Sequence, residues 1–151
     1  MKLKITFIAA ACVLLCLFSH SADTTKPPEP KLSHVHIKVS DLKRSIQFYR
    51  EKLGLRLAME GDGFAILNVG DGKNLFLDEL KGKPIASGGV TLGFSTTTVD
   101  QWYEILRSRG VQLPERPENR AWGARSFYFP DPDGHVIEYE QVLRKQVEKS
   151  N

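Results

Sequence analysis

Cysteine is almost absent from this 151-residue sequence, and both cysteines, Cys12 and Cys16, lie near its N-terminus. The chain after Cys16 therefore has no thiol to act as a nucleophile, form a disulfide or bind a metal ion. A large excess of charge of one sign is also absent, because the net charge of +3 falls to +1 once Lys2 and Lys4 are set aside. Nucleic-acid binding needs a basic surface, so we expect no nucleic-acid partner.

Long hydrophobic runs are missing as well, apart from a short one at the N-terminus. The residues from Ile5 to Phe18 are apolar except for Thr6, follow Lys2 and Lys4, and precede small residues. A membrane-spanning helix needs about 20 apolar residues, whereas a basic start and a shorter apolar run are typical of a secretory signal peptide. We therefore expect residues 1–22 to be a signal peptide, the exported protein to be periplasmic or extracellular, and no stable membrane insertion after cleavage. An uncleaved anchor is the alternative.

The remaining sequence contains one region of domain size. Residues 23–31 include three prolines, which favour a stiff and extended linker. Residues 32–144 are sufficient for a single domain with a modest core. Residues 145–151 are predicted to form a polar tail.

The most informative stretch runs from Arg125 to Glu140 and reads R-S-F-Y-F-P-D-P-D-G-H-V-I-E-Y-E. An aromatic strand, a D-P-D-G turn and an alternating return strand indicate a β-hairpin, with His135 exposed in the turn. Glu138 lies among aromatic and β-branched residues of the return strand. If its carboxylate faces inward, it must be paired, protonated or bound to a metal ion, because burial of a lone charge is unfavourable. The alternative is that Glu138 lies on a solvated face.

Residues around this hairpin predict a pocket. Pairing across the turn is expected to place Phe127 opposite Glu138 and Arg125 opposite Glu140, so that Phe127 and Arg125 share the face of Glu138. Trp122 then lies at the mouth of the hairpin. Aromatic rings beside a cation favour a flat or anionic small molecule. Alternatively, Trp122 and Phe127 belong to the core and Arg125 only pairs with Glu140.

One plan occurs twice along the chain. In each half, a strand at 33–39 or 90–96 leads to a helix, whose cap is Ser40 or Asp41 in the first half and Thr97 or Thr98 in the second. A glycine, Gly54 or Gly110, then ends the helix, and a strand begins again at 55 or 111. The first half then has further strands at 64–69 and 74–80, and the second has the hairpin. We therefore predict an α+β fold in which two βαβββ modules form a curved mixed sheet around a cavity.

Two motifs and this repeat resemble the vicinal oxygen chelate superfamily. The motifs are H-V-H-I-K-V-S-D-L-K-R-S-I-Q-F-Y-R-E-K-L-G-L and W-G-A-R-S-F-Y-F-P-D-P-D-G-H-V-I-E-Y. The superfamily includes glyoxalase I, methylmalonyl-CoA epimerase, extradiol dioxygenases, fosfomycin-resistance thiol transferases and bleomycin-binding proteins. The resemblance covers nearly all of residues 32–142 and is specific for the fold, whereas the same fold hosts many reactions.

The resemblance implies four metal-ligand positions, on the first and last strand of each module. His34 matches the first and Glu138 the last, where Glu138 is also the residue that acts as base in some members. The other two positions carry Phe76 and Thr91, or Val90 if the register slips by one. Neither offers a metal ligand, so we expect Phe76 and Thr91 to contact the substrate instead.

His36 offers a replacement ligand, because it lies two residues from His34 on the same strand face. His34, His36 and Glu138 together would suit a divalent ion of iron, zinc or manganese. The alternative is a metal-free polar cavity in which the two histidines hydrogen-bond to Glu138.

These expectations lead to two functions. The first is an exported enzyme of the superfamily that performs metal-assisted lyase, isomerase or dioxygenase chemistry on a small oxygen-rich molecule. The second is a metal-free small-molecule-binding protein of the bleomycin-resistance type. The sequence leaves open whether the two modules pair within one chain or across a homodimer.

Overall fold

The computed structural model describes residues 29–143. The predicted signal peptide, most of the linker and the polar tail lie outside this range. Residues 32–143 form one compact unit. Within the described residues, no helix has the length and apolar character needed to cross a membrane.

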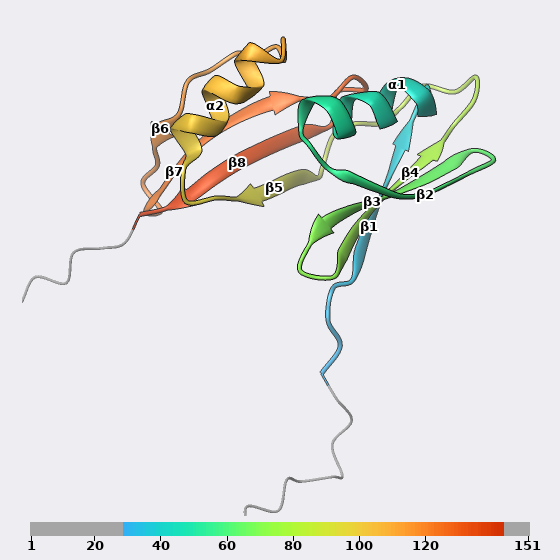
Figure 1. The fold of residues 1–151 in the computed structure, drawn as a ribbon, viewed down its shortest axis with the longest axis horizontal. Coiled ribbons are helices and arrows are strands. Elements are labelled where there is room, and N and C mark those ends of the chain that lie inside the picture. Colours follow the sequence, from blue (N-terminus) through green and yellow to red (C-terminus); the bar gives the residue numbers. More distant parts are fainter. Residues whose placement is uncertain (1–28, 144–151) are drawn as a thin grey trace, which may run out of the picture. The chain divides into compact units, whose positions relative to one another are not determined.

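The first module has the predicted βαβββ order (Figure 1). Its elements are β1 (His34–Val39), α1 (Leu42–Gln47) with the π-helical turn η1 (Phe48–Lys52), β2 (Arg56–Gly61), β3 (Phe64–Gly70) and β4 (Lys73–Glu79). The sheet order is β1-β4-β3-β2, with β1 parallel to β4. Asp41, one of the two caps that the sequence predicted, caps α1 by accepting a hydrogen bond from the Arg44 backbone N–H at 3.0 Å.

The second module repeats this order with β5 (Thr91–Ser95), α2 (Val99–Ser108), β6 (Glu118–Asn119), β7 (Ala124–Pro130) and β8 (Val136–Val142). Its sheet order is β5-β8-β7-β6, and β5 runs parallel to β8. The predicted α+β fold of two modules is therefore confirmed, although the strands form two four-stranded sheets that do not close.

The prediction of a strand at residues 111–113 was wrong. The Val111 backbone N–H donates to the Leu106 carbonyl at 3.0 Å, and its side chain is buried, so this segment completes the end of α2 instead. Pro114 and Pro117 follow and lack the N–H that a strand needs. The short strand β6 begins only after them.

The predicted register of the β7–β8 hairpin was wrong by one residue. The Asp131 N–H donates to the His135 carbonyl at 2.9 Å, which closes a five-residue loop. Tyr128 therefore pairs with Glu138, and Phe127 pairs with Tyr139. Because side chains alternate along a strand, this change moves Phe127 to the face opposite Glu138. His135, which we expected to be exposed, is only 6% exposed.

Each sheet buries one face and leaves the other for polar residues. Helix α1 packs on β3 and β4, and α2 packs on β7 and β8. The alternating apolar residues of both sheets join these helices in one hydrophobic core, which includes Ile37, Leu77, Phe127 and Ile137. The remaining face of each sheet carries the candidate site residues, namely His34, His36 and Phe76 in the first module and Thr91 and Glu138 in the second.

Candidate functional site

Two histidines lie side by side on strand β1. The ring centroids of His34 and His36 are 5.2 Å apart. The Nδ1 atom of His34 lies 2.7 Å from the Ser33 hydroxyl, and that of His36 lies 2.9 Å from Asp78 Oδ2. Neither Nε2 atom has a hydrogen-bond partner within residues 29–143. Each ring therefore has one nitrogen held by the protein and one available to a ligand.

Phe76 forms an aromatic surface against both histidines. It pairs with His36 across the β1–β4 ladder, and their rings stack with centroids 4.3 Å apart and an interplanar angle of 24°. The His34 ring lies 5.1 Å from the same phenyl ring. Phe76 therefore packs against the histidine pair and supplies no metal ligand.

Asp78 lies on strand β4 beside His36 and Lys38. Its Oδ2 accepts a hydrogen bond from Lys38 Nζ at 3.0 Å in addition to its contact with His36. Partial burial would raise the pKa of Asp78, but the hydrogen bonds from His36 and Lys38 outweigh that effect and hold the pKa below its usual value. A carboxylate is therefore favoured next to His36 Nδ1.

Glu138 on strand β8 has a buried carboxylate oxygen, Oε1, without a hydrogen-bond partner among the described residues. Across the ladder, interaction with the Glu138 carboxylate raises the pKa of the Tyr128 hydroxyl. The Arg120 guanidinium lies over the Tyr128 ring at 5.2 Å. On the other side, Glu138 pairs with Gly93 of β5, where an added Cβ atom would meet nothing within 4 Å. The space beside Glu138 is therefore open on this side.

A cavity of about 480 Å³ joins parts of both modules. It is lined by the start of β1 and by β5, and its polar groups include His34, Asn74 and Thr91. Its volume lies within the range of ordinary small-molecule sites, which is roughly 300–1,000 Å³. Of the predicted site residues, the cavity brings His34 and Thr91 together.

Three residues predicted to bind the substrate lie elsewhere. Phe127 is fully buried in the core, and Trp122 is 63% exposed. The Arg125 guanidinium donates to both carboxylate oxygens of Asp100 at 2.9 and 2.7 Å, so Arg125 anchors the start of α2 and does not face Glu138. The prediction that Arg125 and Phe127 share the face of Glu138 is therefore wrong. Sequence reasoning missed Tyr128 and Arg120 because the hairpin loop is one residue longer than the turn that the sequence suggested.

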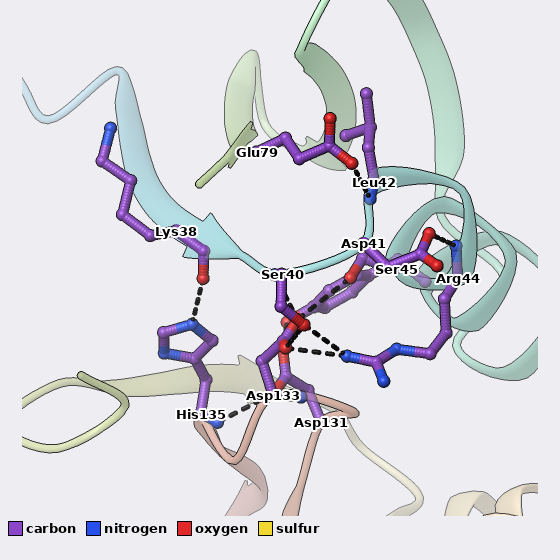
Figure 2. Close-up of polar contacts among 11 residues, drawn as sticks. Lys38, Ser40, Asp41, Leu42, Arg44, Ser45, Glu79, Asp131, Asp133 and His135 are labelled. Atoms are coloured by element: carbon purple, nitrogen blue, oxygen red, sulfur yellow. Dashed lines mark hydrogen bonds and ion pairs between the residues drawn. The ribbon is translucent and has the colours of Figure 1, made fainter. Parts of the chain in front are cut away.

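A second cluster of polar residues connects the β7–β8 loop to the start of α1, and we call Asp131, Asp133 and His135 with their partners the loop network (Figure 2). Asp131 is buried, and its Oδ2 accepts from the Tyr49 hydroxyl at 2.9 Å. Its Oδ1 accepts from the backbone N–H groups of Asp133 and His135 at 2.9 and 2.8 Å. Burial first, and then the Asp131 carboxylate, raise the pKa of Tyr49. Both Asp131 oxygens therefore have donors.

Asp133 and His135 complete this connection (Figure 2). Asp133 Oδ1 accepts from the Ser40 hydroxyl and from the Arg44 guanidinium at 2.7 Å, and Oδ2 accepts from the Ser40 N–H at 3.2 Å. Burial would raise the pKa of Asp133, but these donors hold it below its usual value. His135 Nε2 lies 2.7 Å from the Lys38 carbonyl oxygen. A carbonyl oxygen can only accept a hydrogen bond, so Nε2 is the donor. The D-P-D-G-H and S-D-L-K-R-S motifs therefore bind each other and join the two modules.

Comparison with known families identifies this arrangement. The model of the glyoxalase/bleomycin resistance protein/dioxygenase superfamily matches residues 31–139. The chain belongs to this superfamily.

Relatives within the superfamily include thiol transferases. The metallothiol transferase FosB of Staphylococcus epidermidis is 31% identical over 112 residues, which cover 71% of this chain and 80% of FosB. The glutathione transferase FosA of Serratia marcescens is 35% identical over 112 residues, which cover 71% of this chain and 77% of FosA. Among solved structures, a glyoxalase/bleomycin resistance protein/dioxygenase from Nocardioides has a TM-score of 0.68 and 28% identity, covering 80% of this chain and 88% of that one.

The donor atoms of this superfamily member fit a divalent metal ion in their chemistry. Glu138 Oε1 is a buried oxygen that lacks a partner in the described part of the chain, and imidazole nitrogens of the two histidines are ordinary ligands of divalent metal ions. A single chain does not gather these donors, because no three His, Cys, Asp or Glu side chains of residues 29–143 lie close enough to hold a metal ion. The histidines belong to the first sheet and Glu138 to the second.

Proposed function

We propose that this protein is a metal-dependent enzyme that holds a small molecule through neighbouring oxygen atoms. His34, His36 and Glu138 would bind the ion, and Glu138 would also be the candidate base. The lyase, isomerase and dioxygenase reactions implied by the resemblance all use such a substrate, and the names of FosB and FosA add thiol transfer. When bound, the ion would polarise a substrate oxygen and stabilise the developing negative charge.

The buried Oε1 atom of Glu138 carries this proposal. A carboxylate oxygen removed from water without a hydrogen bond is unfavourable by roughly several kcal/mol unless a cation or a donor reaches it. Tyr128 pairs with Glu138 across the ladder, and its hydroxyl has a raised pKa because of the carboxylate, while Gly93 leaves space next to Glu138. The surroundings of Glu138 thus place a carboxyl oxygen without a partner next to room for a ligand.

We propose further that the site is completed in a homodimer. Within the part of the chain that the structure describes, the histidine pair and Glu138 do not meet. Strands β1 and β5 each lie at the edge of their sheet, so each has backbone groups available to pair with another strand. Val90 next to β5 is 55% exposed, which also favours contact with a second copy. In such a dimer, His34 and His36 of one protomer would meet Glu138 of its partner.

Mixing two inactive variants tests this arrangement. His34→Ala and Glu138→Gln protomers are each expected to bind no metal ion as homodimers. If the site is shared between protomers, a mixed dimer has one site with neither substitution, and equilibrium dialysis will show that metal binding returns to half of the wild-type value per dimer. Failure of metal binding to return in mixed dimers, when wild-type dimers bind metal, would contradict the shared site.

The alternative is a metal-free protein that binds a small molecule. The observation that favours it is the aromatic surface of Phe76, which occupies a ligand position and stacks on His36. This function predicts small-molecule binding that is unchanged in chelator and in Glu138→Gln. The enzyme proposal predicts that both treatments abolish binding.

Export remains a proposal that rests on residues 1–22. Its basic start and short apolar run support secretion. Fractionation of cells that produce the full chain, with N-terminal sequencing of the product, tests it. The proposal expects a periplasmic or extracellular product that begins near Asp23, whereas a full-length cytoplasmic product would contradict it.

A further inference from the structure

We propose that Asp78 is a positioning residue that fixes His36 as the second nitrogen donor of the site. This inference rests on the proposed function and concerns a residue for which the resemblance implies no role. The superfamily resemblance expects the second histidine at Thr91, on the second module. In this chain that donor would come from β1, next to His34.

The geometry holds the His36 ring from two directions. Asp78 Oδ2 lies 2.9 Å from Nδ1, and Phe76 stacks on the ring face. Asp78 reaches this position because β1 and β4 are parallel neighbours, with Lys38 paired to Asp78 and His36 paired to Phe76. The backbone ladder therefore fixes the carboxylate relative to the ring, and a half-turn of the imidazole about its Cβ–Cγ bond would lose the contact with Asp78.

The contact with Asp78 selects one form of the imidazole. A carboxylate accepts a hydrogen bond, so Nδ1 carries the proton and Nε2 keeps its lone pair. This arrangement of carboxylate, histidine and ion is the one that metal sites use to orient a histidine ligand. His34 has a neighbour of a different kind, because the Ser33 hydroxyl that lies 2.7 Å from its Nδ1 can either donate or accept and does not select a tautomer. Both rings therefore have Nδ1 engaged, whereas neither Nε2 has a partner among the described residues.

A simpler role for Asp78 would be an ion pair with Lys38, and substitution of Lys38 distinguishes the two roles. Lys38 Nζ lies 3.0 Å from the same Asp78 oxygen, and the lysine side chain is 57% exposed. If Asp78 served only to form an ion pair with Lys38, removal of the lysine and removal of the carboxylate would have similar effects. If Asp78 positions His36, only removal of the carboxylate affects the histidine.

The test compares Asp78→Asn with Lys38→Met, and uses Asp62→Asn as a matched control in the exposed β2–β3 turn. Nitrogen NMR of the metal-free protein reports which imidazole nitrogen of His36 carries the proton, and dialysis against Zn²⁺ or Mn²⁺ reports metal affinity. We expect Asp78→Asn to shift His36 away from the Nδ1–H form and to weaken metal binding about 10- to 100-fold. Lys38→Met and Asp62→Asn should keep the wild-type tautomer and affinity.

The result that would overturn the inference differs from the result that would overturn the proposed function. If wild-type protein binds metal and Glu138→Gln does not, but Asp78→Asn keeps wild-type affinity and the wild-type His36 tautomer, Asp78 has no positioning role. If wild-type protein and Glu138→Gln bind metal equally, the proposed function fails. In that case the tautomer of His36 in Asp78→Asn still reports whether Asp78 orients the ring.

Discussion

Two regions of this molecule combine histidines with carboxylates, yet the carboxylates differ in whether all their oxygens have hydrogen-bond donors. In the loop network, the oxygens of Asp131 and Asp133 accept hydrogen bonds from Tyr49, Ser40 and Arg44. On the polar sheet faces, Glu138 Oε1 has no partner within residues 29–143. Satisfied polar groups stabilise a fold, whereas a buried oxygen without a partner indicates a place for a ligand. The most recognisable motif of the chain is therefore structural, and the candidate chemistry lies three residues after it.

This difference has a practical consequence for reading superfamily sequences. The D-P-D-G-H motif identifies the fold because it binds the start of α1 in the other module. It says little about the reaction, since its charged groups are occupied by protein donors. Function depends on the residues that alternate with the core on β1, β4, β5 and β8.

We expect the largest loss of stability when a substitution removes the hydrogen bonds of the loop network. Asp131→Ala leaves the buried Tyr49 hydroxyl and two backbone N–H groups without their acceptor, so the free energy of unfolding should fall by about 3 kcal/mol. Urea denaturation of the metal-free protein measures this loss. Asp62→Asn, in an exposed turn, is the control and should change stability by less than about 0.5 kcal/mol. A loss below about 1 kcal/mol in Asp131→Ala would contradict the structural role of the network.

A smaller loss with a defined pH dependence is expected at Asp133. Asp133→Asn removes the charge that Arg44 pairs with, which should cost about 2 kcal/mol near neutral pH. Because the pKa of Asp133 is lower in the folded protein than the ordinary value of 3.8, its contribution is present above that pH and disappears as the pH falls through the lower folded value. Unfolding measured between pH 2 and 7 should therefore show the variant and the wild type converging below about pH 4. Parallel curves over this range would contradict the assignment.

At Glu138, on the polar face of the second sheet, we expect a substitution to leave the free energy of unfolding unchanged or to raise it. Glu138→Gln replaces a buried oxygen that lacks a partner by a neutral amide, so the metal-free protein should be equally stable or more stable by about 1 kcal/mol. The measurement is the same urea denaturation, with chelator present. A loss comparable to that of Asp131→Ala would mean that Glu138 belongs to a structural network like Asp131.

The smallest stability changes are expected from alanine substitutions of one glycine in each region. At Gly93, next to Glu138, an added Cβ meets nothing within 4 Å, so Gly93→Ala should change stability by less than about 0.5 kcal/mol. At Gly134, in the loop network, φ is +87° and the Ser87 hydroxyl would lie 3.0 Å from the new Cβ, so Gly134→Ala should cost about 1–2 kcal/mol. Thermal unfolding of the two variants, side by side, checks the difference, and equal losses would contradict it.

Local features of the fold were predictable from the sequence. Asp41, one of two expected caps, begins α1, and Gly54 and Gly110 end their helices with φ of +80° and +75°. The two βαβββ modules follow from alternation and repeat. These features depend on short stretches of chain, where hydrophobic period and capping chemistry determine the structure.

Features set by distant contacts were not predictable in the same way. The sequence suggests a four-residue turn at D-P-D-G, but the loop closes at His135, because its backbone N–H also donates to Asp131. That one residue decides whether Phe127 or Tyr128 faces Glu138. Burial of His135 likewise depends on the Lys38 carbonyl, which is far away in sequence. The separation of the histidine pair from Glu138 follows from the arrangement of the two sheets, about which local patterns contain no information.

Metal content tests the central claim, that the unpartnered oxygen of Glu138 binds a cation together with the β1 histidines. Protein beginning at Asp23 would be purified without chelator, reconstituted with Fe²⁺, Zn²⁺ or Mn²⁺, and analysed by mass spectrometry of the bound metal. Glu138→Gln would be compared with Asp133→Asn, which makes the same loss of charge within the loop network. We expect a stoichiometric ion in the wild type and in Asp133→Asn, and none in Glu138→Gln. A wild-type protein without metal after reconstitution, or equal metal content in Glu138→Gln, would contradict the account.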